Sequence, residues 1–322
     1  MNSKDFSTRI IDPMDQLYLY GFKSLFKSFV DLYKKKNLPS VILLSGPKGS
    51  GKCTFANHFI NFLLSDGEKH SYSVDNNEIF SDNKSFKLIS SNIHPNFFSL
   101  SAKNEMYIKV EKIRSLLKFL TKSTYTKELK IVLIDDAENL NTSSNNALLK
   151  SLEEPDHKTF FFIIQDNSRK ISETIKSRCL EFRIFHDFKE KKEILNKLFD
   201  QYNQKFDFTT INERFYFDTP GNILKYFLLL DFKKVNLPAD YISFINFLFE
   251  EWKIKKELQF LNFATFFIEM FYSDLILKNK SKLSKLFANK TKIMKLIIDM
   301  KKFNLDKTNS FIVINKILHN EK

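Results

Sequence analysis

The 322-residue sequence has only two cysteines, Cys53 and Cys179, and neither has a partner at metal-ligand spacing. It therefore carries no zinc-binding set and no disulfide framework, and a reduced compartment suits it better than an oxidising one. Long apolar runs are also missing, since Phe160–Ile164 is far too short to span a bilayer. The N-terminal segment MNSKDFSTRIIDPMDQ lacks the apolar region of a signal peptide. We therefore expect a soluble, cytoplasmic protein without membrane contact.

Glycine and tryptophan are scarce, with six and one residues, whereas phenylalanine, lysine, asparagine and isoleucine abound. This bias is typical of an A+T-rich genome. The formal net charge of +13 suits nucleic acid or an acidic partner, but the same bias supplies lysines without any such partner. Apolar residues make up 43% and charged residues 28%, which indicates a globular chain long enough for two or three domains.

Short apolar segments alternate with amphipathic segments over the first 185 residues. Apolar residues at helical spacing predict helices at Asp15–Lys35, from about Lys52, around Ile113–Leu120 and at Ser143–Leu152. Five segments have the composition of buried strands: Val41–Gly46, Ser85–Ser90, Lys130–Asp136, Thr159–Ile164 and Leu180–Phe185. This alternation predicts an α/β fold with a doubly wound parallel sheet.

The character of the chain changes after about His186, where strand-like segments disappear and helical periodicity takes over. A second break is expected near Leu237 and Pro238. We therefore expect three domains: an α/β domain over residues 1–185, a small helical domain over 186–236 and a helical bundle over 237–322.

The segment Ser45–Thr54, SGPKGSGKCT, fits the phosphate-binding pattern G-x-x-x-x-G-K at Gly46–Lys52. Glycines let backbone N–H groups curl around a phosphate, the following helix adds its dipole, and Lys52 would neutralise phosphate oxygens. A chance turn is the alternative, which the strand–loop–helix context disfavours. The candidate nucleotide-binding residues are Gly46, Lys48, Gly49, Gly51, Lys52, Cys53, Thr54, Asp135 and Asp136.

Cys53 stands where this pattern usually has a magnesium ligand. Magnesium prefers hard oxygen ligands, and a thiol is soft. Thr54 comes one residue too late and should point about 100° further around the helix. The loop can therefore bind nucleotide, but metal-assisted hydrolysis is disfavoured.

Asp135 and Asp136 end an apolar strand, where a Walker B acid holds Mg²⁺ through water. An ATPase generally needs a second carboxylate to orient the attacking water. Asp136 is shorter than the usual Glu, and Glu138 lies two residues further on. A pair of solvated turn aspartates is an equal alternative.

The segments NALLKSLEEPDHKTFFFII and TIKSRCLEF resemble the clamp-loader branch of the AAA+ ATPases. The order of motifs also matches over about residues 8–185. The resemblance implies an AAA+ P-loop domain, a helical lid domain and a C-terminal helical collar. It also implies that Arg178, in the SRC motif Ser177–Cys179, is an arginine finger that reaches ATP on a neighbouring subunit. Taken alone, Arg178 would be interpreted as a surface ion pair beside a buried cysteine.

Departures from the motor-subunit pattern of this family, gamma/tau, favour the delta-prime type. The Walker B motif lacks its Glu, and Leu224 stands at the position of a sensor arginine, with Lys225 the nearest cation. The strand-4 sensor segment, Gln165–Asn167, is ambiguous. The four-cysteine zinc module of the family is missing, so no zinc is expected.

The resemblance thus implies a largely non-hydrolysing subunit of the replicative DNA polymerase III clamp loader. Its partners would be gamma/tau and delta subunits in a five-subunit ring, with the sliding clamp and primed DNA contacted through the complex. ATP or ADP with Mg²⁺ is expected to bind weakly or not at all. An active gamma/tau-type ATPase is the first alternative, favoured by the well-formed loop. An unrelated nucleic-acid-binding P-loop protein is the second, disfavoured by the scatter of the basic residues.

Overall fold

The computed structural model describes residues 10–102, 107–122, 129–156, 158–167, 169–202, 218–233, 240–303 and 307–321. The chain forms two compact units, Met1–Lys225 and Tyr226–Lys322. The predicted break near Leu237 and Pro238 lies outside the described residues. The predicted break near His186 falls inside the first unit, so the division into three domains stays a prediction.

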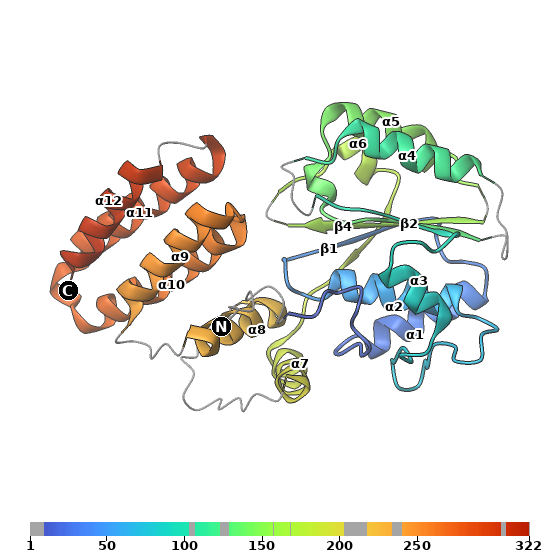
Figure 1. Cartoon of the computed structure of the whole chain (residues 1–322), viewed down its shortest axis with the longest axis horizontal. Helices are drawn as coiled ribbons and strands as arrows, with labels where there is room; N and C mark the ends of the chain where they lie inside the picture. Colours follow the sequence, from blue (N-terminus) through green and yellow to red (C-terminus); the bar gives the residue numbers. More distant parts are fainter. Residues whose placement is uncertain are drawn as a thin grey trace. The chain divides into compact units, whose positions relative to one another are not determined.

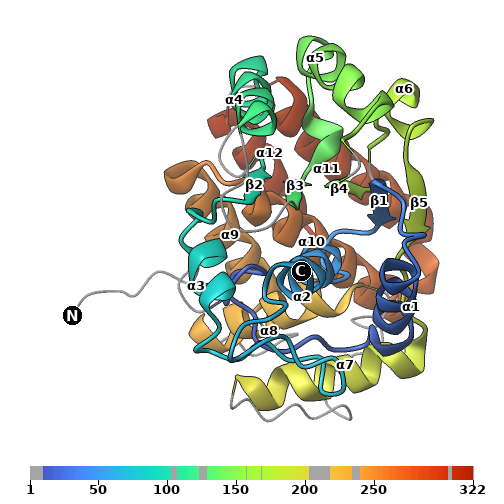
Figure 2. The same ribbon diagram turned by 90° about the vertical axis from the view of Figure 1, so that its right-hand side faces the viewer.

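The first unit is built around a parallel sheet. Its strands are β1 (Val41–Gly46), β2 (Phe97–Leu100), β3 (Lys130–Ile134), β4 (Thr159–Asp166) and β5 (Leu180–Arg183). Their order is β2-β3-β4-β1-β5, and every pair is parallel (Figure 2). The carboxyl ends of β1, β3 and β4 therefore meet at one edge of the sheet, where α/β proteins place their ligands.

Helices cover both faces of this sheet. One face carries α1 (Lys23–Lys34), α2 (Lys52–Leu64) and α3 (Lys84–Ser90), and the other carries α4 (Val110–Thr121), α5 (Thr142–Glu153) and α6 (Glu173–Lys176) (Figure 1). Successive strand residues point to opposite faces. In β1, Ile42 and Leu44 accordingly join the α1–α3 core, while Val41 and Leu43 join the α4–α6 core. The predicted α/β fold with a doubly wound parallel sheet is confirmed.

The strand predicted at Ser85–Ser90 is wrong, because this segment is helix α3. The Asn83 side chain accepts a hydrogen bond from Phe86 N at 2.6 Å and so caps the helix. Glu68 accepts hydrogen bonds from Lys84 N and Ser85 N. These contacts satisfy the first N–H groups of α3, which favours a helix over an edge strand. The true second strand is β2.

Helix α1 starts later than its apolar spacing predicts. Gly21 adopts a φ of 81°, which interrupts helical geometry just before Lys23. Before it, Leu17 O accepts a hydrogen bond from Ile79 N, and Leu19 N donates to Asn77 O. The segment that precedes α1 is therefore extended and tied to a distant loop.

The first unit also contains the 3₁₀ turn η2 (Ala137–Asn139) and helix α7 (Phe188–Gln201). Helix α8 (Pro220–Lys233) starts in the first unit and continues into the second. Its first residues lie beside the loop after β1, as described below.

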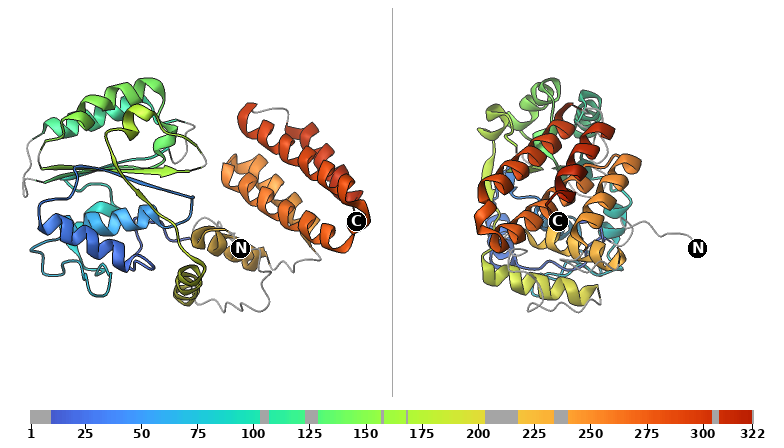
Figure 3. Two further views of the ribbon diagram at one scale, coloured as in Figure 1. Left: turned by 180° about the vertical axis from the view of Figure 1, so that it is seen from behind. Right: turned by 90° about the vertical axis from the view of Figure 1, so that its left-hand side faces the viewer.

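The second unit is helical. Helices α9 (Tyr241–Lys255), α10 (Leu258–Lys278), α11 (Leu283–Phe303) and α12 (Lys307–His319) pack side by side, with the short turn η4 (Lys280–Lys282) between α10 and α11 (Figure 3). Among the described residues, α10 is the one helix long and apolar enough to cross a bilayer, and 50% of its most apolar window is buried. Its Phe267 and Tyr272 are fully buried, as in the core helix of a bundle.

Candidate functional site

The predicted phosphate-binding loop, Gly46–Lys52, follows β1 and leads directly into α2. Gly49 and Gly51 have φ angles of 84° and 86°, in the left-handed region that glycine adopts without strain. The loop therefore turns sharply at two glycines, and the pattern itself requires one of them, Gly51.

The Lys52 side chain points back into this loop. Its ammonium donates to Gly46 O at 2.8 Å and to Pro47 O at 2.7 Å, and the residue is only 5% exposed. Burial lowers the pKa of Lys52, while Asp166, Asp135 and other nearby carboxylates raise it. The cation that would neutralise a phosphate is thus bound by carbonyl oxygens of its own loop.

Cys53 and Asp135 occupy the two positions at which the nucleotide-binding motifs place magnesium ligands, and their side chains contact each other. The Cys53 thiol hydrogen-bonds to the Asp135 carboxyl group, which also accepts a hydrogen bond from Asp136 N at 2.9 Å. Burial raises the pKa of Asp135, the charge of Asp136 raises it further, and the two hydrogen bonds lower it. Asn57 Nδ2 lies 3.5 Å from Cys53 Sγ. Thr54 occupies the next position of α2.

This donor set does not suit Mg²⁺. A soft sulfur stands in place of a hard oxygen, and the Asp135 carboxylate already accepts a hydrogen bond from that sulfur. Among the described residues, no group of three or more His, Cys, Asp and Glu side chains has a metal-binding arrangement.

The remaining carboxylates are engaged elsewhere. Asp136 has a φ of 56°, and its Oδ1 lies 3.9 Å from the ammonium of Lys48. Glu138 accepts a hydrogen bond from Asp166 N at 3.1 Å, and burial is the main reason that the pKa of Glu138 is raised. Glu138 is thus tied to the end of β4, so it is poorly placed to orient a water molecule.

The N-terminal end of α8 lies on the loop. Thr219 Oγ1 donates to Lys48 O at 2.7 Å, and Asn222 Nδ2 lies 3.3 Å from the same oxygen. Gly221 N donates to Gly49 O at 2.9 Å. Two loop carbonyls are therefore held by a segment 171 residues further along the chain, and no sequence pattern predicted these contacts.

The expected sensor positions are Leu224, with Lys225 beside it, and the segment Gln165–Asn167. Leu224 is buried and apolar. Burial lowers the pKa of Lys225, as does the nearby charge of Lys48. Gln165 Nε2 donates to Arg169 O at 2.9 Å. A buried leucine thus stands at the sequence position of the family's sensor arginine.

A cavity of about 140 Å³ lies beside the loop, lined in part by Pro47, Phe185, His186 and Thr219. Pockets that bury a drug-sized ligand have volumes of roughly 300–1,000 Å³. This cavity is therefore smaller than a typical ligand pocket.

The SRC motif closes the C-terminal end of α6. Ser177 Oγ donates to Thr174 O at 3.2 Å, and Arg178 Nη1 donates to the same oxygen at 2.5 Å. Cys179 Sγ donates to Ile175 O at 3.1 Å. Burial raises the pKa of the Cys179 thiol to about 12, so the thiol keeps the proton that it donates. All three side chains donate to carbonyl groups at this helix end, and Ile175 O also accepts from Arg178 N at 3.0 Å.

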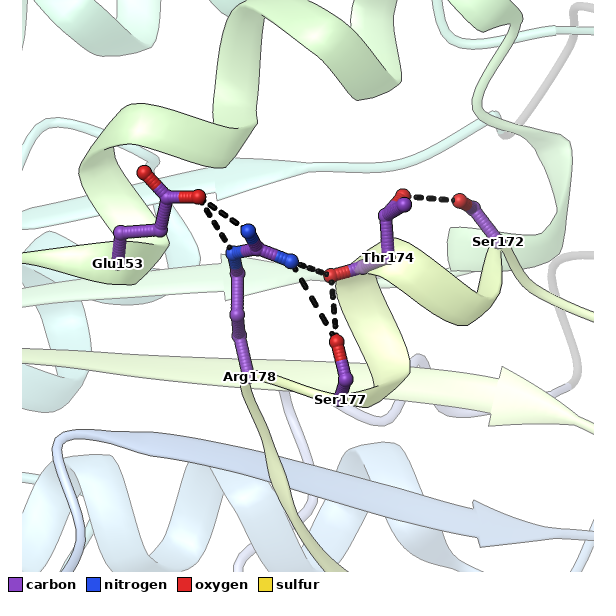
Figure 4. Close-up of polar contacts among 5 residues, drawn as sticks. All are labelled: Glu153, Ser172, Thr174, Ser177 and Arg178. Atoms are coloured by element: carbon purple, nitrogen blue, oxygen red, sulfur yellow. Dashed lines mark hydrogen bonds and ion pairs between the residues drawn. The ribbon is translucent and has the colours of Figure 1, made fainter.

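Arg178 also forms an ion pair with Glu153, the last residue of α5 (Figure 4). Its Nε donates to Glu153 Oε1 at 3.0 Å, and its Nη2 donates to the same oxygen. Taken alone, the sequence predicted Arg178 in a surface ion pair beside a buried cysteine. The ion pair is present, with a partner that the sequence analysis did not identify, and Cys179 is only partly buried. A carboxylate at the end of the LLKSLEEP helix is the signal that could have identified this partner.

One family model matches more than half of the chain. The family described as DNA polymerase III, delta subunit, matches residues 21–187, slightly more than half of the chain. The chain is 34% identical over 140 residues to DNA polymerase III subunit delta' of Pseudomonas aeruginosa, which covers 43% of this chain and 41% of that protein. It is 31% identical over 160 residues to subunit delta' of Buchnera aphidicola subsp. Schizaphis graminum, with coverage of 49% and 47%. The chain thus matches less than half the length of these relatives.

A solved structure shares the fold along most of the chain. The gamma subunit-related protein of DNA polymerase III from Thermotoga maritima superposes with a TM-score of 0.52 at 14% identity, covering 91% of this chain and 99% of that one. This likeness supports an AAA+ fold with helical domains after it. Together with the family match, the order of the motifs assigns the chain: it belongs to the DNA polymerase III delta subunit family, among relatives of the delta-prime type.

Proposed function

We propose that this protein is a delta-prime-type subunit of the DNA polymerase III clamp loader that performs little or no ATP hydrolysis itself. Family membership supports this role, as do the relatives named subunit delta'. Its partners would be gamma/tau and delta subunits in a ring of five, which would load a sliding clamp onto primed DNA in the cytoplasm.

The proposal rests on one observation: the side chains that would bind and hydrolyse ATP form hydrogen bonds with the loop backbone or with each other. Lys52 binds loop carbonyls, and Cys53 binds Asp135. Thr219, directly before α8, donates a hydrogen bond to Lys48 O of the loop. A nucleotide would have to break these contacts to enter, and no hard ligand set would then hold its metal.

In this proposal the chemical contribution of the chain is Arg178, acting on ATP bound by a neighbouring subunit. A guanidinium offsets the negative charge that spreads over the transferring γ-phosphoryl group. Arg178 suits this task because it lies on the surface at the end of α6 and its side chain is 28% exposed.

The test is Arg178→Ala in the reconstituted loader with its clamp and primed DNA. We expect ATP turnover at the site served by the finger to fall about tenfold or more, since such arginines contribute large rate factors. Size-exclusion chromatography should show an intact complex. Unchanged turnover would contradict the finger role.

An active gamma/tau-type ATPase is the second candidate. The loop geometry favours it, and so does a 30% identity over 172 residues to DNA polymerase III subunit gamma of Buchnera aphidicola subsp. Schizaphis graminum. Turnover by the isolated chain that disappears in Lys52→Ala would establish this candidate. We expect no turnover that depends on Lys52.

A further inference from the structure

The Arg178 guanidinium is held on both of its edges by its own chain. Glu153 Oε1 accepts from Nε and Nη2, while Thr174 O and Ser177 Oγ accept from Nη1 (Figure 4). A guanidinium has five N–H donors, and these contacts engage four of them. One N–H of Nη2 remains for a further acceptor.

Glu153 occupies an electrostatically unfavourable place. It is the last residue of α5, where the partial negative charge of the helix dipole disfavours an acid. The positive charge of Arg178 compensates for this, and it comes from a motif 25 residues further along the chain. The pair thus connects the LLKSLEEP helix to the SRC motif.

We propose that Glu153 is the positioning residue for Arg178, which fixes the direction in which the guanidinium presents its remaining donor. This inference rests on the proposed function, because it concerns how Arg178 reaches ATP on a neighbour. Thr174 and Ser177 hold the Nη1 edge, but only Glu153 holds the Nε edge among the contacts that the structure describes.

The physical reason is preorganisation. A free arginine side chain samples many rotamers and loses that freedom when it binds a phosphate. A side chain already held by its neighbours has less freedom to lose, so the reacting geometry is populated more often. Because the side chains of Arg178 and Glu153 are 28% and 47% exposed, solvent screens the pair and its effect on folding is small. Variants at Glu153 should therefore fold and assemble.

The experiment compares Glu153→Ala, Glu153→Gln and Glu154→Ala in the reconstituted loader with clamp and primed DNA. We expect Glu153→Ala to lower kcat about threefold to tenfold with KM for ATP unchanged, because geometry and not nucleotide binding is lost. Glu153→Gln should recover most of the rate, since an amide oxygen still accepts from Nε and Nη2. Glu154→Ala is the matched control, an exposed neighbour of the same type, and should behave as the native chain.

The double variant Glu153→Ala/Arg178→Ala should be no slower than Arg178→Ala alone, because Glu153 acts through the arginine. An unchanged or higher kcat in Glu153→Ala would overturn the inference, and so would an equal further loss in the double variant. If Arg178→Ala lowers the rate but Glu153→Ala does not, only this inference fails. If Arg178→Ala itself has no effect, the proposed finger role fails.

Discussion

Cys53 is the single residue at which this loop departs most from a working ATPase. The substitution removes a hard ligand and also places a hydrogen-bond donor on Asp135, the carboxylate that would hold the metal. The thiol therefore affects both of the positions at which the motifs place magnesium ligands. Cys53 and Asp135, far apart in the sequence, thus form one local interaction.

Cys53→Thr should restore part of the metal response, because a hydroxyl oxygen is a hard ligand. We expect isothermal titration with ATP to show affinity that Mg²⁺ raises by about threefold or more in this variant. In the native chain, Mg²⁺ should leave any binding unchanged. Cys53→Ala is the control, which removes the thiol without supplying an oxygen. Magnesium-dependent binding by the native chain would contradict this account.

At the scale of elements, the contact between α8 and the loop makes a helix glycine indispensable. Alanine normally stabilises a helix relative to glycine by up to about 1 kcal/mol. At Gly221, however, an added Cβ would lie 2.7 Å from Gly49 O, which is backbone and cannot rotate away. At this position, helix propensity therefore favours alanine, whereas packing against Gly49 O favours glycine.

We expect Gly221→Ala to destabilise the chain by about 1–3 kcal/mol, because overpacking outweighs propensity. Urea unfolding followed by circular dichroism measures this change. Ser115→Ala, on the exposed face of α4, is the control and should shift stability by no more than about 0.5 kcal/mol. A stabilised Gly221→Ala chain would show that α8 does not rest on the loop.

Elements with strong local signals could be predicted from the sequence, and contacts between distant segments could not. The apolar run of β1 and the spacing in α5 gave nearly correct bounds. Helix α3 was missed because part of its cap comes from Glu68, which lies outside the segment. Thr219 was missed for the same reason, since nothing local marks its partner. Glu153 lies in a motif that the sequence shows, but its pairing with Arg178 depends on the fold. The loop residues themselves were found because phosphate binding imposes a fixed spacing.

At the scale of the whole molecule, stability should be sensitive to acid. His58 in α2 is fully buried, and its Nδ1 lies 3.1 Å from the Tyr72 hydroxyl. Burial lowers the pKa of His58 to about 3. The unfolded chain therefore binds a proton near pH 6.5 that the folded chain rejects until about pH 3. The net charge of +13 adds repulsion that grows as carboxylates become protonated.

We expect His58 to lower the free energy of unfolding by about 1.4 kcal/mol for each pH unit between about 6 and 4. His58→Gln should make the pH dependence shallower by this amount, even if it lowers stability at neutral pH. Urea unfolding at pH 7, 6 and 5 gives the slopes. His319→Gln, at an exposed position, is the matched control. Equal slopes in native chain and His58→Gln would refute the assignment.

The contact of Thr219 and Gly221 with the loop also bears on how the glycine pattern is read in other sequences. A loop whose backbone packs against another segment of the same chain is constrained as tightly as a loop whose backbone binds a substrate. Selection for this packing would preserve the glycine spacing with or without nucleotide chemistry, because a changed loop would lose its contacts with the start of α8. In such a sequence, an intact phosphate-loop pattern indicates conserved packing and does not by itself indicate nucleotide chemistry.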